Sequence, residues 1–170
     1  SRQGHEIAGH GWMHEQWNTL PPDIEQALIA RTTDALSEVV GRPPRGWRAP
    51  SGLMTADTLQ FLHAAGYAYD SSCADDDVPY VLSTTHDRPD TLVELPWQWA
   101  LDDAVYFAYP GVIRHPDEVL GIWTREFDAA YAQTGYFTLV CHPRYIGRPA
   151  RIGVLERLLD HIQSHAGVWF

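Results

Sequence analysis

Segments typical of β-strands alternate with segments typical of amphipathic helices along the whole chain. Such alternation predicts an α/β fold with a parallel sheet, either a barrel or an open doubly wound sheet. A complete barrel of eight strands needs about 250 residues, so residues 1–170 are expected to be a single catalytic-type domain that is the central and later part of a longer one. The expected helices cover 22–40, 55–65, 116–134 and 152–162, and the expected strands 5–9, 46–50, 67–70, 93–97, 136–141 and a last one beginning at 168. Residues 71–91 are expected to form a long functional loop.

The composition excludes several classes of function. A net charge of -10 and a pI near 5.2 argue against a nucleic-acid surface. All 12 basic residues are arginine, which excludes lysine Schiff-base chemistry and a phosphate-loop lysine within this chain. Cys73 and Cys141 have no CxxC neighbours and suggest a reducing, cytoplasmic setting. No apolar run approaches the length of a membrane span.

The candidate functional side chains follow the expected strands. Two histidines four residues apart, His10 and His14, follow the first strand, and both can face one metal ion if the backbone turns helically after Gly11. Because functional groups gather at the carboxyl ends of parallel strands, all of these groups are expected on one rim. The others are Arg48, Asp70, Trp97, the pair Asp102 and Asp103, and His142.

Each of these residues also has a structural interpretation. The histidines can be packed and hydrogen-bonded, Arg48 can pair with a loop aspartate, and Asp70 before two serines can be a turn signal. The helical histidines His63, His161 and His165 have no partners in the sequence and are assigned no function.

Five short motifs resemble, in order, those of the polysaccharide deacetylase (NodB-homology, carbohydrate esterase family 4-like) family. The resemblance covers nearly the whole chain and is nearest to small peptidoglycan deacetylases and allantoinase-like proteins. The motifs are His10-Gly-Trp-Met-His14-Glu15, Gly46-Trp-Arg48-Ala-Pro50-Ser-Gly52, Tyr69-Asp70-Ser71-Ser72, Glu94-Leu95-Pro96, and Leu139-Val-Cys-His142-Pro143 with Gly147-Arg148-Pro149.

This resemblance implies a distorted (β/α)7-8 barrel, truncated at both ends in this chain. It also implies hydrolysis of N-acyl, usually N-acetyl, amides on a sugar or peptidoglycan-like substrate, assisted by zinc or another divalent metal. His10 and His14 match the metal ligands, Arg48 the arginine that orients catalytic carboxylates, and His142 the general acid. Asp103 or Asp102 is the preferred acidic partner of His142, with Asp70 in reserve. Trp97, Pro96, Trp12 and Asp70 are expected to contact substrate, and a homo-oligomer is compatible with the resemblance.

Two departures from the family pattern qualify these expectations. A Thr-Phe-Asp-Asp type motif, which supplies the general base and a third metal ligand, has no room before His10, so the isolated fragment is expected to be inactive. Gly11 stands where many relatives have serine or threonine, so one hydrogen bond near the ligands is made differently.

Two alternative functions remain open. An allantoinase-like cyclic-amide hydrolase can work without metal, but such proteins tend to lack the second histidine, so His14 favours the deacetylase. The chain can also be a non-catalytic carbohydrate-binding remnant, with tryptophans stacking on sugar rings.

Overall fold

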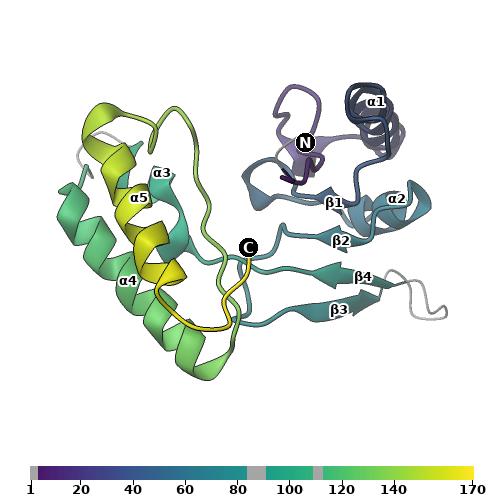
Figure 1. Cartoon of the computed structure of the whole chain (residues 1–170). Helices are drawn as coiled ribbons and strands as arrows, with labels where there is room; N and C mark the ends of the chain where they lie inside the picture. The colour runs from purple at the N-terminus through teal and green to yellow at the C-terminus, as the bar shows by residue number, and fades with distance from the viewer. Residues whose placement is uncertain (1–3, 84–90, 109–112) are drawn as a thin grey trace. The chain divides into compact units, whose positions relative to one another are not determined.

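The computed structural model describes residues 4–83, 91–108 and 113–170, and these divide into two compact units (Figure 1). Unit 1 is Ser1–Pro96 and unit 2 is Trp97–Phe170. Each has a core of its own, around Trp17, Trp47 and Leu62 in unit 1 and around Trp123, Phe127 and Leu158 in unit 2. In the described part of the chain, no helix is long and apolar enough to cross a membrane.

Unit 1 is built on a mixed four-stranded sheet in the order β1-β2-β4-β3. β1 (Gly46–Trp47), β2 (Tyr69–Asp70) and β4 (Thr91–Glu94) run parallel, and β3 (Tyr80–Ser83) is antiparallel to β4. The prediction of a parallel sheet is therefore confirmed for three strands. The prediction of a structureless loop over 71–91 is wrong at β3, because alternate half-buried residues there pair with β4; residues 84–90 of that segment lie outside the described part.

The helices of unit 1 follow the predicted apolar spacing. α1 (Pro22–Val40) ends at Gly41, whose φ of 79° supplies the left-handed C-cap, and α2 (Thr58–Ala64) follows the short 3₁₀ turns η1 (Trp17–Thr19) and η2 (Pro50–Gly52). Pro21 occupies the N-cap of α1, and the nearby Thr19 hydroxyl donates to the carbonyl of Gln16 instead of to the helix.

Unit 2 is helical. η3 (Trp99–Leu101) and α3 (Asp103–Phe107) precede α4 (Pro116–Gln133) and α5 (Pro149–Gln163), which pack side by side (Figure 1). The predicted strand over 136–141 reduces to one isolated bridge, Asp102 with Val140, and the predicted strand at 168–170 has no ladder. Helix α3 was not predicted, since five residues are too few to show a helical period.

The α/β class is confirmed, and the sheet is open. Gly9 makes an isolated parallel bridge to Trp47 beside β1, so the predicted first strand is reduced to a single pairing. Over the described ranges, no strand pairing closes the sheet into a barrel.

Candidate functional site

The His10–His14 segment is a bent loop and not a helical turn. Gly11 and His14 have φ of 72° and 59°, both in the left-handed region. The helical turn expected after Gly11 is therefore wrong, yet the two rings still meet edge to face with centroids 5.1 Å apart. Both histidines are exposed.

Glu15 and Gly11 hold this loop in shape. The Glu15 carboxylate accepts the backbone N–H groups of Trp12 and Met13 at 3.1 and 2.8 Å. A Cβ at position 11 would lie 2.8 Å from Glu15 Oε2 and 2.9 Å from Pro50 Cγ. Glycine is therefore required here both by the backbone conformation and by the space available.

A backbone carbonyl fixes the orientation of His10. Its Nδ1 lies 2.7 Å from the carbonyl oxygen of Arg48, just beyond β1. Since a carbonyl only accepts, Nδ1 carries the proton and Nε2 the lone pair, which is the arrangement typical of metal-ligating histidines. Two neutral imidazoles fit two of the three protein ligands of a catalytic zinc. Within the described ranges, no third histidine, cysteine or carboxylate joins this pair in a group suited to an ion.

Arg48, Ser71 and Ser72 connect the ends of the parallel strands by hydrogen bonds. Arg48 donates from Nε to the Ser71 carbonyl at 2.7 Å and from Nη2 to Ser71 Oγ at 2.5 Å. Ser71 Oγ donates to the carbonyl of Leu95 at 2.6 Å, and Ser72 Oγ accepts the backbone N–H of Ala49 at 2.8 Å. The Asp-Ser-Ser motif therefore joins the segments that follow β1, β2 and β4.

Asp70 and Glu94 form a buried carboxyl pair. They are register partners on β2 and β4, so their side chains share one face of the sheet, and both are fully buried. Desolvation first, and then the charge of Asp70, raise the pKa of Glu94 to about 8; desolvation also raises the pKa of Asp70. Glu94 is thus the member of the pair that holds a proton at neutral pH.

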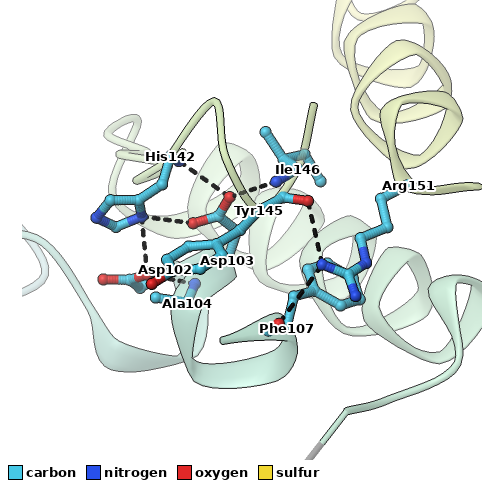
Figure 2. Close-up of polar contacts among 8 residues, drawn as sticks. All are labelled: Asp102, Asp103, Ala104, Phe107, His142, Tyr145, Ile146 and Arg151. Carbon is cyan, nitrogen blue, oxygen red and sulfur yellow. Dashed lines mark hydrogen bonds and ion pairs between the residues drawn. The ribbon is translucent and has the colours of Figure 1, made fainter. Parts of the chain in front are cut away.

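In unit 2, Asp103 holds His142 by two contacts (Figure 2). His142 Nδ1 lies 2.6 Å from Asp103 Oδ1, and the His142 backbone N–H donates to Oδ2 at 2.9 Å. Asp102 Oδ1 lies 3.7 Å from the same ring nitrogen and caps α3 by accepting the N–H of Ala104 at 2.7 Å. Of the two predicted acidic neighbours, Asp103 is thus the one hydrogen-bonded to the ring. Its side chain is completely buried, whereas the His142 side chain is 40% exposed.

The segment after His142 supplies a second backbone N–H donor to the Asp103 carboxylate. A tight turn brings the Ile146 N–H to Asp103 Oδ2 at 3.0 Å, and a Cβ at Gly147 would lie 2.4 Å from the Pro143 carbonyl oxygen. Arg151 braces the turn from α5, donating to the carbonyl of Tyr145 at 3.3 Å (Figure 2). Sequence reasoning did not identify Ile146 and Arg151, since a backbone donor and a brace carry no motif of their own.

The predicted substrate contacts differ in accessibility. Trp12 is 37% exposed, with the Arg31 guanidinium 3.9 Å from its ring centroid. Pro96 and Trp97 are buried, and Trp97 packs on Trp99. Asp70 is fully buried, and its oxygens accept the Ser72 hydroxyl and N–H.

Comparison with known proteins gives consistent matches. The polysaccharide deacetylase family profile matches residues 1–69. The peptidoglycan deacetylase of Helicobacter pylori is 25% identical over 97% of this chain and 66% of its own length. A crystal structure from Mycobacterium smegmatis assigned to the polysaccharide deacetylases is 36% identical, with a TM-score of 0.90 over 99% of this chain and 60% of that one.

The match extends to an allantoinase. The structure of Puue allantoinase is 26% identical, with a TM-score of 0.87 over 99% of this chain and 56% of its own. The chain thus spans about three fifths of the length of these relatives. In its motifs, fold and relatives this chain is therefore similar to the polysaccharide deacetylases.

Proposed function

We propose that this chain is the core of a metal-dependent hydrolase that removes N-acyl, chiefly N-acetyl, groups from a sugar or peptidoglycan-like substrate. The proposal rests on one observation: the buried Asp103 carboxylate accepts a hydrogen bond from Nδ1 of the partly exposed His142. A histidine fixed in this way presents Nε2 for proton transfer, as a general acid must. The similarity to polysaccharide and peptidoglycan deacetylases supports this reaction class.

In the proposed reaction, His142 Nε2 delivers a proton to the departing amine as the C–N bond breaks. Asp103 holds the ring in one orientation through its contact with Nδ1. The backbone N–H groups of His142 and Ile146 hold the Asp103 carboxylate in place.

His10 and His14 would hold the divalent ion, zinc by preference, through neutral imidazole nitrogens. When bound, such an ion polarises the amide carbonyl and activates a water molecule. The His10 Nδ1 contact with the Arg48 carbonyl supports this role, since it reserves Nε2 for a ligand.

We further propose that the open sheet forms part of the distorted (β/α)7-8 barrel that the family resemblance implies. The parallel strands β1, β2 and β4 support this assignment, because consecutive parallel strands are the repeating element of such barrels.

The proposal is tested with the protein at its natural length, by acetate release from N-acetylated peptidoglycan and chitooligosaccharides. His142→Ala is expected to lower turnover by about 100-fold or more, with the metal content unchanged. His63→Ala, a histidine on α2, serves as the matched control and is expected to keep wild-type turnover. Wild-type turnover in His142→Ala would show that the general-acid assignment is wrong.

An allantoinase-like cyclic-amide hydrolase is the second candidate, favoured by the likeness to Puue allantoinase. The same protein is therefore assayed for ureide hydrolysis before and after chelation. Ureide hydrolysis that survives complete metal removal, without acetate release, would establish this second candidate in place of the first.

A further inference from the structure

A cluster of two histidines and an aspartate lies on unit 2, outside the site described above. Asp128 is on α4, His161 is in the last turn of α5 and His165 follows that helix. Asp128 Oδ1 is 2.6 Å from His161 Nε2 and 3.9 Å from His165 Nε2. One ligand atom from each residue lies within 4.8 Å of the other two.

The surroundings of the cluster orient both imidazoles. His165 Nδ1 lies 2.9 Å from the His161 carbonyl oxygen, which only accepts, so Nδ1 carries the proton and Nε2 the lone pair. The Phe127 ring packs edge to face on both histidines, with centroid separations of 5.7 and 5.1 Å. Tyr131 covers His165 at 4.9 Å and donates its hydroxyl to the Ala166 carbonyl. Phe127 therefore restrains both rings, and the His161 carbonyl and Tyr131 further restrain the His165 ring, before any ligand arrives.

We propose that Asp128, His161 and His165 form a second binding site, for a divalent transition-metal ion of the zinc type. Two imidazole nitrogens and one carboxylate oxygen suit zinc, with water completing a tetrahedron. The ion takes the place of the proton between Asp128 and His161. Metal–ligand bonds of about 2.0–2.1 Å require ligand atoms about 3.3 Å apart, so this contact widens by rotation of an exposed carboxylate.

The cluster is also exposed enough for an ion to reach it from solvent. The side chains of Asp128, His161 and His165 are 49%, 33% and 26% exposed. An ion there would link α4 to the C-terminal end of α5, the two helices that pack together in unit 2. The proposal is independent of His10 and His14, which belong to unit 1.

The test uses the whole chain carrying His10→Gln and His14→Gln, which removes the ligands proposed for the hydrolytic metal. Metal-free protein is titrated with Co²⁺, read by visible absorption, and then with Zn²⁺ by calorimetry. We expect one equivalent to bind, and at least a 10-fold loss of affinity when His161→Gln, His165→Gln or Asp128→Asn is added. His63→Gln is the matched control and keeps full affinity.

The His165→Gln variant separates loss of binding from misfolding. Residue 165 lies beyond α5, and its substitution leaves the His161–Asp128 contact in place. Far-UV circular dichroism is expected to be unchanged in that variant while binding is lost. Failure of the His10/His14 variant to bind any metal would overturn the proposal. Binding that persists in all three cluster variants would place the ion elsewhere and also overturn it.

Discussion

At the scale of single residues, buried carboxylates take opposite roles according to their neighbours. Asp103 accepts two backbone N–H groups and bonds the His142 imidazole at Nδ1. Glu94 faces another carboxylate across the sheet and is protonated instead. Both side chains are fully buried, so exposure does not distinguish them, whereas their neighbours do.

Asp103→Asn is expected to lower both turnover and stability, since an amide nitrogen would face donors where the carboxylate now accepts. The free energy of unfolding is expected to fall by about 2 kcal/mol or more, because hydrogen bonds to a charged group are lost. Asp102→Asn is the matched control: asparagine caps a helix nearly as well as aspartate, so its effect on stability stays within about 0.5 kcal/mol. Urea unfolding and steady-state kinetics measure the two effects; equal losses in both variants would contradict the pairing of Asp103 with His142.

Glu94→Gln tests the protonated carboxyl. A folded pKa of about 8 against an ordinary 4.5 means that the contribution of Glu94 to stability is complete below pH 4.5 and is lost as the pH rises through 8. The wild-type free energy of unfolding is thus expected to fall between these limits, and Glu94→Gln is expected to flatten that fall. Urea titrations at pH 6 and pH 9 measure the difference, with the exposed Glu38→Gln as control. A wild-type pH dependence in Glu94→Gln would contradict the assignment.

At the scale of elements, one buried carboxylate joins α1 to its neighbours. Glu25 is fully buried and accepts the Trp17 indole N–H at 2.8 Å, the Thr55 hydroxyl at 2.6 Å and the Thr58 hydroxyl. The buried face of α1 therefore centres on Glu25 and Ile29, whereas the apolar Ile24 and Val39 are exposed. Apolar spacing predicted the helix correctly and its inward face only in part.

Glu25→Ala is expected to lower the free energy of unfolding by about 3 kcal/mol or more, because it leaves buried donors on Trp17 and Thr58 without an acceptor. Glu38→Ala, on the exposed side of the same helix, is the control and stays within about 0.5 kcal/mol. Chemical unfolding followed by tryptophan fluorescence measures both. A loss in Glu25→Ala no larger than the control would mean that the network adds nothing to stability.

At the scale of the whole molecule, the two separate cores predict that a core substitution in one unit speeds amide hydrogen exchange first in that unit. Leu158→Ala, in the core of unit 2, is expected to cost about 2–5 kcal/mol and to speed amide hydrogen exchange in α4 and α5 first. Leu62→Ala, in the core of unit 1, is expected to speed exchange first in α1, α2 and the sheet. Exchange read by mass spectrometry checks both. Uniform acceleration throughout the chain by either change would show that the units unfold together.

Much of this molecule was determined by sequence features that act locally. Apolar periodicity predicts α1, α4 and α5, and short motifs predict the segments carrying His10, Arg48 and His142, because helix formation and turn chemistry depend on residues a few positions apart. Tertiary structure alone decided that Asp103 rather than Asp102 holds His142, that Asp70 is buried against Glu94, and that Asp128 joins His161 and His165. Those contacts join residues more than 20 positions apart, so they depend on strand register and helix packing, which local sequence does not encode.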